Sequence, residues 1–259
     1  MPTHTLLRYP GGKSRAIKYI LPILEKTGKR SLVSPFFGGG AVELKLVSKG
    51  WEVFGYDGWK PVVNFWQKAK ENPGKIANMV DAMRPVSNEA FSHMQKIYGD
   101  VKDLWEQAAI FYTLNRCVHT GTGLSGGKTN WGDGNPRLTD STVKKLRTFE
   151  APSFSMELKD FADSLVRHQN DVLIYADPPY FCVGKTLYDH NKDKEFDHFK
   201  LFNLLNEKPL WVLSYNDVPE IVEMYKEYTV IRPEWKYGIK RNNSSELLIL
   251  SKEMAKYAQ

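Results

Sequence analysis

An apolar run at residues 172–176, rich in β-branched and aromatic side chains, is the clearest structural signal in the chain. A short, continuously apolar run of this kind predicts a buried strand in the centre of a parallel sheet. Pro178 and Pro179 end the strand, because proline has no N–H to donate to a neighbouring strand. Asp177 and Tyr180 flank the two prolines. Ligands of open α/β sheets bind just beyond the carboxyl ends of the strands, so we expect a functional site at this turn.

A second apolar run lies nearer the N-terminus. Residues 32–40 predict a short strand that ends in the triple glycine Gly38, Gly39 and Gly40, and residues 41–46 continue as a helix. A strand, a glycine turn and a helix form the first unit of a nucleotide-type fold, where backbone and ligand approach closely and the helix N-terminus favours a negative group. The glycines do not follow Gly-x-Gly-x-x-Gly, so a dinucleotide is not indicated, and S-adenosylmethionine is the alternative ligand.

The second strand is predicted at residues 52–57 and ends at Asp57. An acid at this place commonly accepts hydrogen bonds from ribose hydroxyls. The glycine turn upstream favours that role over a plain turn aspartate.

Most of the remaining chain has helical or strand-like periodicity. The expected helices cover residues 14–26, 64–70, 88–98, 102–115 and 218–225. The expected strands cover residues 210–216, 228–231 and 246–250. A short connection between the last two strands predicts an antiparallel pair at the sheet edge. The middle helices carry the large apolar residues Phe65, Trp66, Phe91, Ile97, Leu104, Trp105, Ile110 and Phe111. We interpret the aromatic ones as core rather than base-stacking groups.

Composition and charge narrow the class of protein. A chain of 259 residues can form one large domain or one domain with an insertion. Its net charge of +6 favours a polyanionic partner. Cys117 and Cys182 are far apart and outside a Cys-x-x-Cys motif, which indicates no disulfide framework, no zinc site and a reducing compartment. No apolar run approaches the length of a membrane span, so we expect a soluble, cytoplasmic protein.

Two short sequences resemble the end of a phosphate-binding P-loop, at Lys13 and at Lys128. A P-loop needs a glycine five residues before its last glycine, and Leu7 and Thr122 stand at those places. We therefore exclude an NTPase. Lys13 at the start of a helix is left with two interpretations, a contact with an anionic group or a solvated lysine beside a capping turn.

A long glycine-rich loop follows the middle helices, and such loops inside compact domains are often functional. It contains side chains of the types that contact phosphates and base edges: Arg116, Lys128, Asn130, Asn135 and Arg137. The alternative is a disordered surface loop.

The turn after residues 172–176 suits a particular kind of substrate. Asp177 offers acceptor oxygens, Pro178 offers a carbonyl on a backbone of fixed φ, and Tyr180 offers a flat face. Two acceptors beside an aromatic ring suit a planar molecule with an exocyclic amino group, such as a nucleobase. An ordinary strand-ending turn is the alternative, because Asp-Pro commonly opens turns.

Seven blocks, in order, resemble the Dam-like DNA adenine-N6 methyltransferases, and the resemblance covers most of the chain. The blocks are Arg8-Tyr9-Pro10-Gly11-Gly12-Lys13, Pro35-Phe36-Phe37-Gly38-Gly39-Gly40, Asp57, Asn115-Arg116 with Gly121 and Ser125-Gly126-Gly127, Asp177-Pro178-Pro179-Tyr180, Ser214-Tyr215-Asn216-Asp217, and Glu246-Leu247-Leu248-Ile249.

The resemblance implies an α/β fold with a seven-stranded, mostly parallel, Rossmann-like sheet and helices on both faces. Residues 1–60 and 150–259 would form the catalytic domain, and residues 61–149 a helical target-recognition insertion with its loop at residues 115–137. Partners would be double-stranded DNA and, as an open question, a cognate restriction endonuclease, with no membrane and no metal. The protein would act in the cytoplasm of a bacterial cell, or of a host cell if a phage or virus encodes it.

The resemblance also implies roles for individual residues. The catalytic residues would be Asp177, Pro178, Pro179 and Tyr180. S-adenosylmethionine would be bound by Tyr9, Lys13, Phe36, Phe37, Gly38, Gly39, Gly40, Asp57 and Asp177. DNA would be contacted by Arg116, Lys128, Asn130, Arg137 and Phe181.

The chain departs from the family pattern at two places. The first cofactor motif often opens with an acid where this chain has Ser34, which puts in doubt a polar contact near the methionine end of the cofactor. The segment that recognises GATC in the best-known members is not recognisable between Gly121 and Arg137, so that target is not carried over.

Other substrates remain open at this point. The amino nitrogen could belong to cytosine, to RNA adenine or to a protein glutamine, although cytosine N4 enzymes more often carry serine in the place of Asp177. RNA would have to be distinguished by its 2′-OH elsewhere. A different class of function is a DNA-binding homologue without activity, against which the intact Asp-Pro-Pro-Tyr and triple glycine argue.

Overall fold

The computed structural model describes residues 5–118, 121–128, 137–168, 171–181, 196–233 and 246–258, and within these the chain divides into two compact units. The helical unit comprises Met1–Gly12, Gly38–Gly40 and Trp59–Pro152. The sheet unit comprises Lys13–Phe37, Ala41–Gly58 and Ser153–Gln259. Each unit is described by itself.

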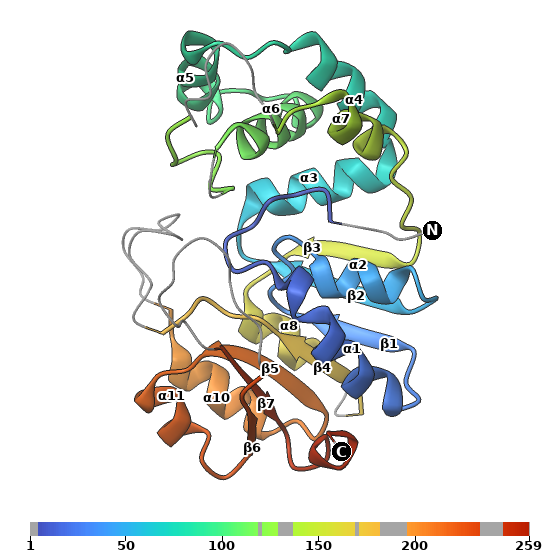
Figure 1. Ribbon diagram of the computed structural model, residues 1–259, viewed down its shortest axis with the longest axis vertical. Helices are drawn as coiled ribbons and strands as arrows, with labels where there is room; N and C mark the ends of the chain where they lie inside the picture. The colour runs from blue at the N-terminus through green and yellow to red at the C-terminus, as the bar shows by residue number, and fades with distance from the viewer. Residues whose placement is uncertain are drawn as a thin grey trace. The chain divides into compact units, whose positions relative to one another are not determined.

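The sheet unit contains, among the described residues, a seven-stranded sheet in the order β3-β2-β1-β4-β5-β7-β6 (Figure 1). Its strands are β1 (Ser31–Ser34), β2 (Glu52–Asp57), β3 (Phe154–Leu158), β4 (Leu173–Ala176), β5 (Trp211–Asn216), β6 (Thr229–Ile231) and β7 (Glu246–Leu250). Strands β1 to β5 pair in parallel, whereas β7 runs antiparallel to both β5 and β6. The predicted α/β class, the central position of β4 and the antiparallel pair at one edge are confirmed.

The strand order reverses beside β1. The chain adds β2 and β3 on one side of β1, and β4 and β5 on the other. Crevices at such reversals, outside the carboxyl ends of the strands, are where open α/β sheets bind ligands. The turn after β4 therefore begins at the place where the sequence predicted a site.

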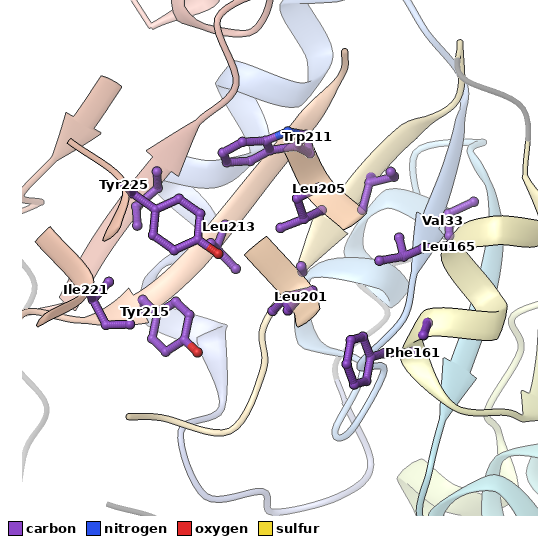
Figure 2. Close-up of a cluster of buried hydrophobic side chains, with 14 of the residues drawn as sticks. Val33, Phe161, Leu165, Leu201, Leu205, Trp211, Leu213, Tyr215, Ile221 and Tyr225 are labelled. Atoms are coloured by element: carbon purple, nitrogen blue, oxygen red, sulfur yellow. The ribbon is translucent and has the colours of Figure 1, made fainter. Parts of the chain in front are cut away.

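Helices cover both faces of the sheet. On one face lie α8 (Phe161–Arg167), α10 (His198–Asn206) and α11 (Pro219–Met224), whose apolar residues pack on alternate strand residues such as Val33 and Leu213 (Figure 2). On the other face α1 (Ile17–Lys26) packs on α2 (Ala41–Val47), which packs on β2 (Figure 1). All residues of β4, β5 and β7 are buried, as expected for strands covered on both faces.

The helical unit consists, in its described part, of α3 (Lys60–Glu71), α4 (Pro73–Ala82), α5 (Asn88–Ile97), α6 (Leu104–Cys117) and α7 (Asp140–Arg147). Helix α6 contacts α3, α4 and α5 and is buried over most of its length. The ring of Phe65 stacks on that of Tyr112 with centroids 5.6 Å apart. The interpretation of the aromatic residues as core is confirmed for Phe65, Trp66, Phe91 and Phe111.

Leu104 is the first residue of α6, directly after the capping residue Asp103, and it is 44% exposed. The first turn of the helix therefore lies at the surface.

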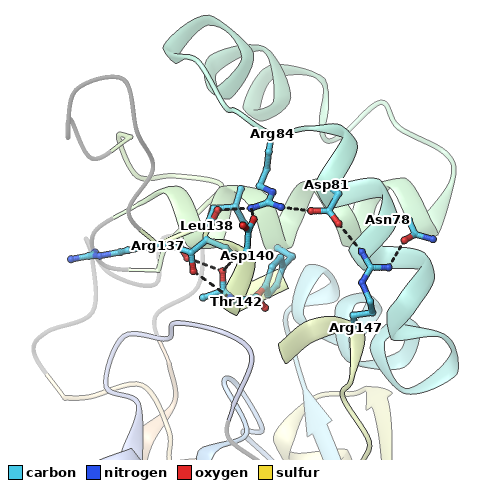
Figure 3. A network of polar contacts seen from close by, with 10 residues as sticks. Asn78, Asp81, Arg84, Arg137, Leu138, Asp140, Thr142 and Arg147 are labelled. Carbon is cyan, nitrogen blue, oxygen red and sulfur yellow. Dashed lines mark hydrogen bonds and ion pairs between the residues drawn. The ribbon is translucent and has the colours of Figure 1, made fainter. Parts of the chain in front are cut away.

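A polar network joins α7 to α4 (Figure 3). Asp81 lies between two arginines: Arg84, which also reaches Asp140 with an Nη1–Oδ1 distance of 2.8 Å, and Arg147, at an Nη2–Oδ2 distance of 2.6 Å. The side chain of Arg137 points away from this network (Figure 3). Because the network is partly exposed, we expect it to contribute little to the free energy of folding. Its role is to fix how α4 and α7 align with each other.

Candidate active site

Asp177 leaves the end of β4 and meets a buried lysine. The Nζ atom of Lys13 lies 2.7 Å from Oδ1 of Asp177, and the lysine side chain is 3% exposed. Lys13 reaches this place from a short 3₁₀ turn, Lys13–Arg15, where the sequence predicted the beginning of a longer helix. Of the two interpretations of Lys13, the contact with an anionic group is correct, and the group is the Asp177 carboxylate.

The same ammonium group holds Tyr180. Lys13 Nζ donates a hydrogen bond of 3.0 Å to the Tyr180 hydroxyl, and it lies 5.0 Å from the centroid of the tyrosine ring. Lys13 thus connects the first and last residues of the Asp-Pro-Pro-Tyr segment, because a single ammonium group contacts both polar side chains.

A second carboxylate approaches Lys13 from β7. Oε1 of Glu246 lies 3.7 Å from Nζ, and the Glu246 side chain is 2% exposed. Burial raises the pKa of Glu246 to about 8, with Lys13 opposing and Asp177 adding to the rise. Burial also raises the pKa of Asp177, against the opposing charge of Lys13. The sequence offered one signal for Glu246, an acid at the head of an otherwise apolar strand.

Ser34, where the family pattern often has an acid, lies beside a carboxylate from another element. Its Oγ donates a hydrogen bond of 2.8 Å to Oε1 of Glu43 in the first turn of α2, and both residues are buried. Burial raises the pKa of Glu43 to about 7; backbone N–H groups and Ser34 oppose the rise, and Asp177 adds to it. A carboxylate is therefore present next to position 34 although the strand does not supply it.

The residue after Tyr180 is held by the end of β5. The Asn216 side chain accepts a hydrogen bond from the backbone N–H of Phe181 and donates one to its carbonyl, each at 3.0 Å. This two-point contact imitates the pairing of adjacent strands and fixes the backbone next to Tyr180. Sequence reasoning quoted Asn216 within a late motif and gave it no role.

Two phenylalanines precede the glycine turn and differ in their surroundings. Phe36 is half-buried and stacks on Phe161 with centroids 5.5 Å apart. Phe37 is 2% exposed and stacks on Phe154. A Cβ atom on Gly55 would lie 2.4 Å from the Phe37 ring, so glycine is required there. Phe37 thus packs into the sheet, and Phe36 is the more accessible of the two.

Asp57 ends β2 on the same sheet and is 8% exposed. Its backbone carbonyl accepts a hydrogen bond from Lys159 N–H at 3.1 Å, just beyond the end of β3. The predicted ribose acid therefore lies at the carboxyl end of the sheet, as Asp177 does.

In the helical unit, the glycine turn is packed against Tyr9. A Cβ atom on Gly38 or on Gly39 would lie 2.8 Å from the tyrosine side chain, and Gly38 has a φ of +47°. Trp66 donates a hydrogen bond of 2.8 Å from Nε1 to the Gly38 carbonyl. Two of the three glycines are therefore required by the close approach of Tyr9.

The described part of the glycine-rich loop is held by side-chain amides. Asn115 Nδ2 donates to the carbonyls of Gly121 and Arg8, at 2.6 Å and 2.7 Å. Gln95 Nε2 donates to the carbonyls of Gly123 and Gly126. Residues 121–128 thus follow a defined path along the helical unit.

Two of the predicted DNA-contacting residues are neighbours. Arg116 Nε donates a hydrogen bond of 2.9 Å to the Arg137 carbonyl. Burial, together with the charges of Arg137 and Arg116, lowers the pKa of Arg8 to about 10, so three arginines lie close to one another. Lys128 is placed separately, with Nζ 3.0 Å from Asn88 Oδ1. Asn130 lies outside the described residues.

No group of three or more histidine, cysteine, aspartate and glutamate residues that could hold a metal ion occurs within the described ranges. None of the helices in the described part of the chain combines the length and apolar character needed to cross a membrane.

A mostly parallel, doubly covered sheet whose central strand ends in Asp-Pro-Pro-Tyr defines a Rossmann-like methyltransferase. The model of the D12 class N6 adenine-specific DNA methyltransferase family matches residues 9–239, and the chain belongs to this family. A comparison with curated proteins gave no match. The prediction of an adenine-specific DNA methyltransferase is thereby confirmed, and the family implies a methyl donor and a DNA substrate.

Proposed function

We propose that the protein transfers a methyl group from S-adenosylmethionine to N6 of an adenine that has been turned out of duplex DNA. The observation that carries the proposal is the Asp177–Lys13–Tyr180 contact at the end of β4, which fixes the Asp177 carboxylate and the Tyr180 ring beside one another. Family membership supports the reaction and the base.

The residues of the sheet unit fit the proposed cofactor. Asp57, at the end of β2, offers acceptors for the ribose hydroxyls. Phe36 offers an aromatic face, and Asp177 and Glu43 bring negative charge to the positively charged sulfonium and ammonium groups. We assign Lys13 to Asp177 and Tyr180, instead of to the polar end of the cofactor. In the helical unit, Tyr9, Gly38, Gly39 and Gly40 stay proposed cofactor residues, as does Phe37 in the sheet unit.

The chemical task is to make N6 a better nucleophile, because its lone pair is delocalised into the adenine ring. Asp177 and the Pro178 carbonyl would accept hydrogen bonds from the amino group and direct the lone pair toward the methyl carbon. A nitrogen–carbon bond would form as the carbon–sulfur bond breaks, the sulfonium would leave as a thioether, and the proton lost by N6 would pass to water. S-adenosylmethionine supplies the activated methyl group. Positioning and preorganised charge carry most of the rate enhancement.

Lys13 decides which oxygen of Asp177 serves the substrate. Oδ1 of Asp177 is buried and lies against the ammonium, whereas the side chain as a whole is 22% exposed. Oδ2 is therefore the oxygen that we assign to the amino group. Because N6 lies inside the duplex, the base must leave the stack, and Tyr180 and Phe181 would stack on it.

The helical unit is our candidate for target recognition, corresponding to the insertion at residues 61–149 with its loop at residues 115–137. Arg116, Arg137 and Lys128 would contact phosphates or base edges, as would Asn130. The net charge of +6 suits a DNA partner. A cytoplasmic location belongs to the same proposal, and a cognate restriction endonuclease remains a candidate partner.

The decisive experiment is transfer of a labelled methyl group from S-adenosylmethionine to unmodified DNA, followed by nucleoside analysis and mapping of the modified sites. We expect N6-methyladenine at one short motif. In the Asp177→Ala variant we expect at least a 100-fold loss of transfer with cofactor binding retained, because a positioned acceptor of this kind contributes about 10² or more in rate. Near-normal transfer by that variant, or label in RNA or protein instead of DNA, would contradict the proposal.

A further inference from the structure

The reaction described above leaves unused two buried polar residues of the late strands, Asn216 and Glu246. They stand directly opposite each other in the antiparallel pair of β5 and β7. Directly opposed residues project from the same face of a sheet. Their neighbours Tyr215 and Leu247 belong to the apolar cluster on the other face, so Asn216 and Glu246 share the face on which Ser214 meets Tyr175.

Each of the two residues contacts a different part of the catalytic segment. Asn216 holds the backbone of Phe181 by two hydrogen bonds. Glu246 reaches Lys13, whose ammonium lies 2.7 Å from Asp177 Oδ1, 3.0 Å from the Tyr180 hydroxyl and 3.7 Å from Glu246 Oε1. Glu246 and Lys13 are 2% and 3% exposed, so water cannot replace either partner at low cost.

We propose that Glu246 is a positioning residue for methyl transfer, which holds the ammonium of Lys13 from behind so that it stays on Asp177 and Tyr180. The inference rests on the proposed function, because it concerns the same catalytic aspartate. Asn216, opposite Glu246, fixes the backbone of Phe181, directly after Tyr180. The register of β5 and β7 therefore places Asn216 and Glu246 side by side, each beside its own part of the segment.

The charge state of Glu246 gives this role a measurable signature. Among the described residues, the titratable groups around it are Lys13 from the 3₁₀ turn and Asp177 from the end of β4, and Glu43 and Tyr175 lie near Asp177 in the same buried layer. With a pKa of about 8, Glu246 carries a proton at neutral pH. Asp177 is then the carboxylate that forms the ion pair with Lys13. Above that pH the two carboxylates compete for one ammonium, which draws it away from Asp177.

The test compares Glu246→Gln, Glu246→Ala and the control Glu253→Gln under single-turnover conditions, from about pH 6.5 to about pH 9.5. Glu253 is an exposed glutamate paired with Lys256. We expect the wild-type and control rates to fall as the pH rises past about 8. Glutamine has the shape of protonated glutamate, so Glu246→Gln should stay within about twofold of the wild type at neutral pH and lack the alkaline fall. Glu246→Ala should lose about tenfold at neutral pH.

Two results overturn the inference: an alkaline fall in Glu246→Gln that matches the wild type, or a wild-type rate at every pH in Glu246→Ala. Thermal melting of each variant identifies a loss due to unfolding, and the isosteric glutamine variant keeps the test valid if the alanine variant does not fold. A second readout needs no turnover. The side-chain NMR signal of Lys13 should shift near pH 8 in the wild type and not in Glu246→Gln. Absence of that shift refutes the role of Glu246, whereas absence of methyl transfer by the wild type refutes the proposed function.

Discussion

Lys13 contacts both ends of the Asp-Pro-Pro-Tyr segment. It is buried, it contacts Asp177 and Tyr180, and it lowers the pKa of Asp177 against the effect of burial. Without the ammonium, Asp177 would hold its proton to higher pH and would be a poorer acceptor for the N6 amino group. The charge of Lys13 therefore favours the ionised form of Asp177, which we propose as the catalytic carboxylate.

Replacing Lys13 by glutamine should lower the rate of methyl transfer by about 10² and move the acidic limb of the pH–rate profile to higher pH. The measurement is single-turnover transfer to DNA as a function of pH. Lys18→Gln is the control, because Lys18 is exposed and lies on the adjoining helix α1 over Tyr19. Equal rates for the two variants would show that the ammonium does not serve Asp177.

At the scale of elements, strands with a strong apolar signal could be predicted closely. The second strand was predicted at residues 52–57 and is β2, Glu52–Asp57. The sequence does not predict the edge strand β3, because three of its five residues are partly or fully exposed and its apolar signal is weak. Helix α8 has seven residues and α10 has nine; such short segments show too few periods to be distinguished from loops.

The residues of the candidate site also differ in how well the sequence predicts their roles. Asp177 and Tyr180 could be found because they are adjacent in sequence and end a clear strand. Glu43 and Glu246 could not be assigned roles, since their importance comes from contacts with Ser34 and Lys13 that only the folded chain creates.

The glycine-rich loop offers a test of local structure. Gly121 has a φ of +86°, and a Cβ atom there would lie 2.2 Å from the Arg8 carbonyl oxygen. Gly121→Ala should therefore destabilise the protein by about 2 kcal/mol or more, because both the backbone conformation and the contact are unfavourable. Gly127→Ala is the matched control, since nothing lies within 4 Å of its added Cβ, and it should be neutral or slightly stabilising. Urea unfolding of both variants would measure the difference, and equal midpoints would contradict the placement of Gly121.

For the whole molecule, the buried carboxylates predict how stability depends on pH. The pKa of Glu43 rises from 4.5 to about 7 on folding, and that of Glu246 from 4.5 to about 8. Between pH 4.5 and these folded-state pKa values, the folded state binds more protons than the unfolded state. The stability that these groups contribute is fully present below about pH 4.5 and is lost as the pH rises through their folded values.

Glu43→Gln removes one of these titrations while keeping an acceptor for Ser34. We expect the free energy of unfolding of the wild type, relative to Glu43→Gln, to decrease by on the order of 2 kcal/mol as the pH rises from about 4.5 to about 8. Urea midpoints measured at several pH values would show it, with the exposed Glu207→Gln variant following the wild-type curve throughout. If Glu43→Gln also ran parallel to the wild type, Glu43 would titrate alike in the folded and unfolded chains. The carboxylate beside Ser34 would then be as well solvated as one at the surface, against the burial that the fold gives it.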